Sequence, residues 1–78
     1  MESDLSIEER VFLLAIYTKE PKESLTEVLH SLVNTGMFSK KRGKKVLQML
    51  EEKKFVVDKQ LSFKGVAEAK KAKEEFTL

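Results

Sequence analysis

The chain has 78 residues, and this length limits it to one domain, which we expect to span residues 1–78. It contains no cysteine, which excludes disulfide bonds and a thiolate zinc site, and its longest apolar run, residues 11–17, is too short to cross a bilayer. Residues 1–38 carry three basic and seven acidic side chains, whereas residues 39–78 carry twelve basic and six acidic ones, which indicates either a face that binds a polyanion or a solvated lysine-rich surface.

The first predicted element is a helix from Ile7 to about Lys19. Ser6 and Glu9 have the spacing of a capping box, and glutamates in the first turn suit the positive end of a helix. Apolar residues go nearly all the way round this helix, which predicts a buried, central position. Pro21 is expected to end the helix.

A second capping box, Ser24 with Glu27, predicts a helix that Gly36 ends in a left-handed conformation. The next two residues, Met37-Phe38, form a short apolar turn. Ser39 is predicted to cap a third helix that runs to about Lys53. The short link at residues 34–39 suits a helix-turn-helix.

A short hairpin and a last helix complete the predicted fold. Aromatic and β-branched residues predict a strand at residues 55–57, a turn at Asp58-Lys59-Gln60 and a returning strand at Leu61-Ser62-Phe63. Ser62 can also cap a helix from Phe63 to about Phe76. Its predicted inward residues are Val66, Ala69, Ala72 and Phe76. The expected fold class is therefore mainly α (α+β), with three helices, a short β-hairpin and a C-terminal helix.

Residues 36–65 resemble the small winged helix-turn-helix regulators of bacteria and archaea, including the multiple-antibiotic-resistance-regulator type. The pattern is a serine cap, apolar positions along the helix, a hydrophobic strand and a short wing that ends in Leu-(Ser/Thr)-x-x-Gly. It is carried here by Ser39, Gly43, Leu47, Leu50, Phe55-Val56 and Leu61-Ser62-Phe63-Lys64-Gly65. Two residues depart from it, since Gly43 replaces a branched apolar residue and Lys54 replaces a glycine. Gly43 permits either close packing against the second helix or close approach to a backbone.

Five of the first six positions of the third helix are basic: Lys40, Lys41, Arg42, Lys44 and Lys45. Cations are unfavourable at the positive end of a helix, and the preceding two helices place glutamates there instead. Local rules of this kind are broken most often at functional sites. By helical spacing, Lys41, Lys44, Lys45 and Gln48 lie opposite the apolar face of this helix. The alternative interpretation is a solubilising surface or a patch that faces an acidic protein.

The resemblance and the basic cluster together predict a DNA-binding protein, a transcriptional regulator without cofactor or metal that acts on double-stranded DNA as a homodimer. The predicted contact residues are Ser39, Lys40, Lys41, Arg42, Lys44, Lys45, Gln48, Lys59 and Lys64. Lysines mainly neutralise phosphate, whereas only Arg42 offers a bidentate fork and only Gln48 suits adenine, so we expect limited sequence discrimination. Candidate dimer surfaces are the first and last helices, including Phe76 and Leu78.

The alternative function is a protein-interaction module of the same fold, without nucleic-acid binding. It would bind acidic partners through the lysine face or apolar partners at Met37-Phe38 and Phe76. We do not expect an enzyme, because His30 has no second histidine or cysteine beside it and the serines are helix caps without an adjacent base. The acidic start of the chain, residues 1–4, argues against a secretory leader, so we expect a cytoplasmic protein with no membrane partner.

Overall fold

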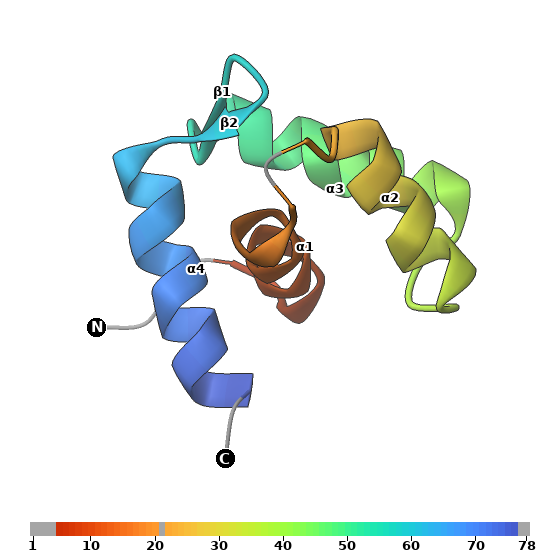
Figure 1. The fold of residues 1–78 in the computed structure, drawn as a ribbon, viewed down its shortest axis with the longest axis horizontal. Helices are drawn as coiled ribbons and strands as arrows, with labels where there is room; N and C mark the ends of the chain where they lie inside the picture. Colours follow the sequence, from red (N-terminus) through yellow and green to blue (C-terminus); the bar gives the residue numbers. More distant parts are fainter. Residues whose placement is uncertain (1–4, 21, 77–78) are drawn as a thin grey trace.

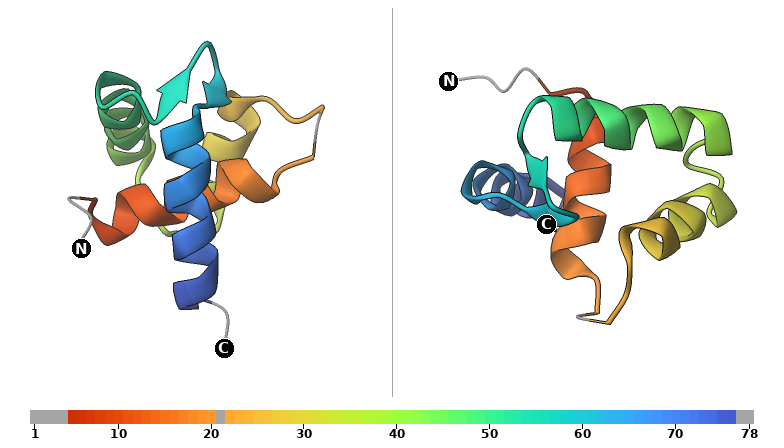
Figure 2. Two further views of the ribbon diagram at one scale, coloured as in Figure 1. Left: turned by 90° about the vertical axis from the view of Figure 1, so that its left-hand side faces the viewer. Right: turned by 90° about the horizontal axis from the view of Figure 1, so that it is seen from above.

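The computed structural model describes residues 5–20 and 22–76, which form four helices and a small antiparallel sheet. The helix α1 (Ile7–Thr18) lies at the centre, with α4 (Phe63–Phe76) crossing it on one side (Figures 1 and 2). On the other side α1 packs against α2 (Leu25–Asn34) and α3 (Lys40–Glu52). The expected α+β class with four helices and a hairpin is confirmed, and the winged helix-turn-helix topology stays a prediction.

Serine hydroxyls begin the first three helices, as the sequence predicted. The hydroxyl oxygens of Ser6, Ser24 and Ser39 accept the N–H groups three residues further on, at 3.2, 3.2 and 3.1 Å. In α1 and α2 the side chain of the glutamate three residues after the cap accepts a hydrogen bond from the backbone N–H of the cap serine, which completes the capping box. The helix α1 ends at Thr18, and Pro21 lies outside the described residues.

Left-handed residues end α2 and α3. Gly36 has a φ of +83° and confirms the predicted stop. After α3, Phe55 N–H bonds to the Leu50 carbonyl at 3.0 Å and Lys54 N–H to the Glu51 carbonyl at 3.1 Å, which is a Schellman motif. Its left-handed position is Lys54, with a φ of +66°, so the residue that departs from the winged-helix pattern adopts the conformation that usually favours glycine.

The hairpin is shorter than the sequence predicted. Its strands are β1 (Val56–Val57) and β2 (Gln60–Leu61), paired antiparallel with Val57 opposite Gln60. Asp58 and Lys59 both have positive φ, as a two-residue type I′ turn requires. The predicted turn at residues 58–60 and the predicted strand at residues 61–63 are therefore wrong in their bounds, because this turn leaves Gln60 free to pair.

The start of α4 depends on Ser62 and Gly65. The Ser62 hydroxyl oxygen accepts Gly65 N–H at 3.1 Å and donates to the Lys54 carbonyl at 2.6 Å, so the predicted cap also ties the helix to the end of α3. A Cβ on Gly65 would overlap the carbonyl oxygen of Phe55. The Leu-Ser-x-x-Gly sequence thus holds the hairpin against α4. The first residue of that helix is Phe63, which is 98% exposed.

The core lies between α1 and the other helices. Its fully buried members include Phe12, Leu13, Val46, Leu50 and Ala69. Of the residues expected to face inward from α4, Ala69 and Ala72 are buried and Val66 is half-buried. The predictions for the Phe76 side chain and for Leu78 lie outside what the structure describes.

The predicted buried, central position of α1 does not extend to its outward face. Ile7 is 69% exposed, and Val11 and Leu14 are only half-buried. The physical reason is that a domain of this size has too few elements to surround a central helix. The helices α2, α3 and α4 cover three sides of α1, and the fourth side faces outward (Figure 1).

Candidate nucleic-acid interface

Four lysines lie in the first two turns of α3, and we call Lys40, Lys41, Lys44 and Lys45 the basic face. All four side chains are exposed. Val46 and Leu50, on the opposite side of the same helix, are buried in the core. The alternation follows from helical spacing, so the burial of the apolar stripe fixes the direction in which the lysines point. Gln48 is exposed on the same outward side as the basic face.

Among the described residues, no carboxylate forms an ion pair with the basic face. The residues three and four positions away from each of its lysines along α3 include no Asp or Glu, so no intrahelical ion pair can form. Within residues 5–20 and 22–76, the ion pairs that do form involve none of these four ammonium groups. The lysine ammonium groups repel one another, and the positive end of the helix dipole adds to this repulsion. An anion at this end of α3 would therefore be stabilised.

Arg42 is not free, in contrast to the predicted open guanidinium fork. Its Nε and Nη2 atoms both donate to Oε1 of Glu8 in α1, at 3.0 and 2.5 Å. Arg42 lies at the edge of α3 that faces α1, and Glu8 stands beside that edge. The hydrogen bond from Arg42 lowers the pKa of the Glu8 carboxyl below 4.5, although desolvation opposes this. The sequence indicated Glu8 only as a first-turn glutamate and did not reveal this contact.

A second ion pair joins the next residue of α1 to the far end of α3. Glu9 is only 2% exposed, and its Oε2 accepts a hydrogen bond from Lys53 Nζ at 3.0 Å while its Oε1 accepts Ser6 N–H at 3.1 Å. Burial raises the pKa of Glu9, but these hydrogen bonds and the Lys53 charge outweigh it, so the pKa lies below 4.5. Two consecutive glutamates of α1 thus pair with a residue in the first turn of α3 and with its C-cap residue.

Replacing Lys53 with methionine should change both the stability and its pH dependence. In the parent, Glu9 has a lowered pKa, so its contribution is present above pH 4.5 and is lost as the pH falls through the folded-state pKa. Without the Lys53 ammonium, burial dominates and the pKa of Glu9 rises. We expect about 2 kcal/mol less free energy of unfolding at pH 7, and a gain in stability on mild acidification.

The measurement is urea unfolding at pH 7, 5.5 and 4, monitored by circular dichroism. Lys54→Met is the matched control, because it removes an adjacent exposed ammonium that forms no ion pair within the described part of the chain. Equal losses in the two variants would show that the contact between Lys53 and Glu9 is unimportant.

The two lysines predicted near the hairpin differ in their surroundings. Lys59 is exposed at the turn and forms no ion pair among the residues described. Lys64 donates to the Lys53 carbonyl at 3.2 Å, and its Nζ lies 4.6 Å from the centre of the Phe55 ring. Lys64 therefore stabilises the junction of α3, β1 and α4, and a contact with a partner would have to displace those interactions.

Gly43 lies on the buried side of α3, where it faces α2. A Cβ at this position would overlap Cδ1 of Leu29 and would lie 3.9 Å from Cβ of Phe38. Of the two explanations for this glycine, the structure supports close packing against the second helix. The nearest neighbours are side chains, and Cδ1 of Leu29 occupies the space that a Cβ would take.

Other candidate residues give little indication of a site. His30 is exposed on α2, and among the described residues no group of three acidic or histidine side chains could hold a metal ion. Phe38 is buried and stacks on Phe12 with ring centroids 6.2 Å apart, so the predicted apolar docking site at Met37-Phe38 is reduced to Met37, which is 51% exposed. None of the described helices is long and apolar enough to span a membrane.

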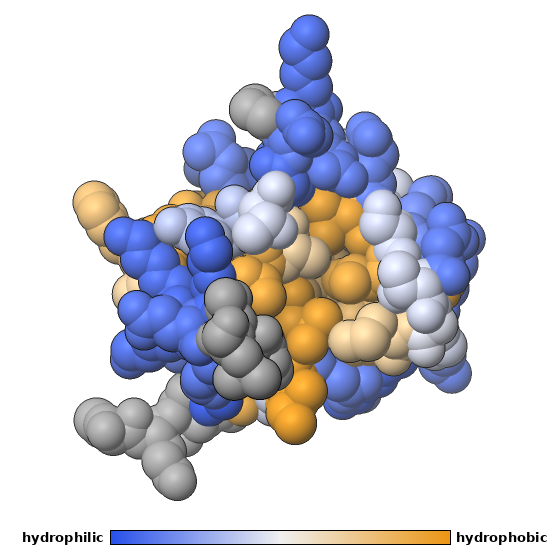
Figure 3. All heavy atoms as spheres, turned by 60° about the horizontal axis from the view of Figure 1, so that its bottom comes forward, coloured by the Kyte–Doolittle hydropathy of each residue, from blue (hydrophilic) through white to orange (hydrophobic). Residues whose placement is uncertain are grey.

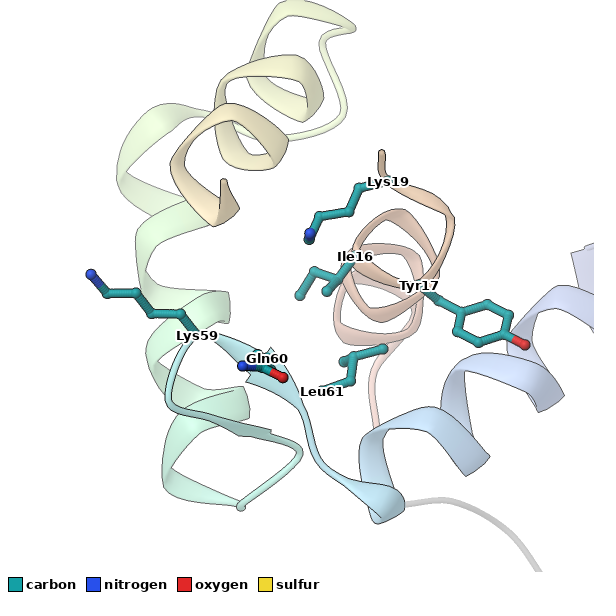
Figure 4. A pocket seen from close by; sticks show the side chains of 6 residues that line it. All are labelled: Ile16, Tyr17, Lys19, Lys59, Gln60 and Leu61. Carbon is teal, nitrogen blue, oxygen red and sulfur yellow. The ribbon is translucent and has the colours of Figure 1, made fainter. Parts of the chain in front are cut away.

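A small pocket of about 220 Å³ lies between the end of α1 and the hairpin (Figure 4). Its lining residues are Ile16, Tyr17, Lys19, Lys59, Gln60 and Leu61. In Figure 4 the Lys59 side chain extends away from Ile16, and the Tyr17 ring points toward α4. The polar groups therefore do not converge on one point. In a binding site for a small molecule, by contrast, a few polar groups converge on the ligand.

Comparisons with protein-family models, with curated protein sequences and with solved structures found no match to this chain.

Proposed function

We propose that this chain is a winged helix-turn-helix protein that binds duplex DNA through the basic face and regulates transcription in the cytoplasm. The observation that carries the proposal is the basic face itself, with four exposed lysines at the positive end of α3 and no carboxylate partner among the described residues. Such an arrangement is unfavourable in the free protein and is relieved by a negatively charged polymer.

In this proposal α3 lies in the major groove with its outward side against the DNA. The lysine ammonium groups and the first N–H groups of α3 neutralise phosphates, while Gln48 lies at the depth of the base edges. Lys59 at the hairpin turn reaches the neighbouring backbone. Since phosphate contacts carry no sequence information, we expect tight binding with limited sequence discrimination.

The order and joining of the elements support the winged-helix interpretation. A five-residue link, residues 35–39, connects α2 to α3, and the hairpin follows α3 at once. The contacts of Ser62 and Gly65 give a structural role to the Leu-Ser-x-x-Gly sequence on which the resemblance depends. We propose a homodimer as well, since one domain of this size covers a short stretch of DNA.

A second candidate function is a protein-docking module, and the outward face of α1 favours it. Figure 3 shows an apolar band flanked by hydrophilic side chains on the side that lies at the bottom of Figure 1. Ile7, Val11 and Leu14 contribute apolar surface along the outward side of α1. Contiguous exposed apolar surface of this kind is often a contact for another protein. The same face is our candidate for contact with a second copy of the chain.

Binding of the protein to a random-sequence DNA duplex across a salt series tests the proposal. The expected result is a logarithm of affinity that falls linearly with the logarithm of salt concentration, with a slope of about −0.9 per phosphate contact. Fluorescence anisotropy of a labelled duplex gives this slope. If no binding is detected even at low salt, the DNA-binding proposal is rejected and the protein-docking function is favoured.

A further inference from the structure

Every arginine of this chain is engaged by a carboxylate from another helix. Arg10 of α1 bonds to Glu75 of α4, with Nη1 2.5 Å from Oε2, and Arg42 of α3 bonds to Glu8 of α1. The four lysines of the basic face have no such partner in the described part of the chain. The two arginines therefore join helices, whereas the lysines of the basic face lie on the open surface.

The contact between Glu8 and Arg42 occupies one edge of the guanidinium, formed by Nε and Nη2. A guanidinium binds phosphate or guanine through two parallel N–H donors, whereas a lysine acts as a point charge. Arg42 directs two of its donors at one oxygen of Glu8, and it stands at the border of the basic face, between Lys41 and Gly43 in sequence. While this contact persists, Arg42 is oriented toward α1 and away from the outward side of α3.

The pair is accessible enough to be exchanged. The side chain of Arg42 is 41% exposed and that of Glu8 is 35% exposed. Ion pairs with this much solvent contact are weak, so we expect the protein to stay folded when the carboxylate is removed. The fold is held elsewhere by the buried apolar stripe of α3 and by the contact between Glu9 and Lys53.

We propose that Glu8 withholds Arg42 from the DNA, so that the parent protein binds duplex with lysines alone and Glu8 sets the strength of the interface. This inference rests on the proposed DNA-binding function. It assigns to Glu8, a residue of the central helix, an inhibitory role at a surface formed by α3. Loss of the Glu8 charge would add one guanidinium to the basic face.

Glu8→Gln tests the inference, and Glu75→Gln is the matched control. Both substitutions remove one negative charge and one partner of an arginine, but Glu75 pairs with Arg10 at the contact between α1 and α4, away from the basic face. We expect Glu8→Gln to steepen the salt slope by about one unit and to raise affinity roughly 8-fold at 0.1 M salt. Glu75→Gln should leave the slope unchanged.

Arg42→Ala completes the test. In the parent background it should leave the salt slope unchanged, and in the Glu8→Gln background it should abolish the gain. Thermal unfolding by circular dichroism establishes that each variant is folded. If the parent binds duplex and Glu8→Gln and Glu75→Gln behave alike, the inhibitory role of Glu8 is overturned while the DNA-binding function stands. If the parent does not bind duplex at all, both proposals fail.

Discussion

Replacing Lys41, Lys44 and Lys45 together with alanine is expected to lower duplex affinity by up to about 500-fold at 0.1 M salt and to flatten the salt slope by up to about three units. The three ammonium groups are exposed on the outward side of α3 and form no ion pair with a described carboxylate. Each therefore remains available for one phosphate. The helix itself should persist, because alanine is a better helix former than lysine and the buried stripe is unchanged.

A triple variant of α4 controls for net charge. Lys70, Lys71 and Lys73 are also exposed, and their replacement by alanine changes the net charge by the same amount. These lysines lie on the helix that crosses α1 on the side away from α2 and α3 (Figure 2). Anisotropy titrations of both variants should show a large loss only for the α3 variant. Equal losses would mean that total charge, and not the basic face, determines binding.

Replacing Gly65 with alanine is expected to destabilise the fold by about 3 kcal/mol, which approaches the whole margin of a domain of this size. The added Cβ would overlap the Phe55 carbonyl oxygen and would lie 3.2 Å from Cδ2 of Leu61. That carbonyl accepts Ser62 N–H at 3.0 Å, so it cannot move without breaking the junction of hairpin and helix. We expect the midpoint of thermal unfolding to fall by roughly 12–24 °C.

Gly36→Ala is the matched control for the effect of losing a glycine. A Cβ at Gly36 meets no atom within 4 Å, so its cost comes only from the left-handed φ of +83° and is about 1 kcal/mol. Helix propensity alone predicts that Gly65→Ala stabilises the protein relative to Gly36→Ala, since alanine in α4 is favoured over glycine by about 1 kcal/mol. If Gly65→Ala raises the unfolding midpoint, the inferred close approach of Gly65 to the Phe55 carbonyl is wrong.

Short-range patterns were sufficient to predict the helices. Each serine cap satisfies N–H groups a few residues away, and Gly36 supplies a local backbone conformation, so neither depends on distant parts of the chain. The hairpin bounds were predicted less well. Nothing in the composition of residues 58–60 resembles the Asn-Gly pairs that identify a type I′ turn, and Asp58 and Lys59 adopt positive φ without a glycine.

The sequence predicted that the lysines of the basic face are exposed, but it did not predict the contact of Arg42 with α1. Lys41, Lys44 and Lys45 follow from helical spacing, because an apolar stripe on one side of α3 leaves the other side in solvent. Arg42 lies at the border of the two sides, where spacing cannot decide between solvent and a neighbouring helix. Its partner is 34 positions away in the sequence, and no local signal identifies a contact over that separation.

The start of each helix, the apolar side of α3 and the location of the positive charge all follow from local sequence, because these properties depend on residues within a few positions of each other. The tertiary structure decided which charges are free. It paired Glu8 with Arg42 and Glu9 with Lys53, fixed Gly65 against Phe55, and left one side of α1 uncovered. These features depend on how the helices cross, and packing of the whole core sets that geometry.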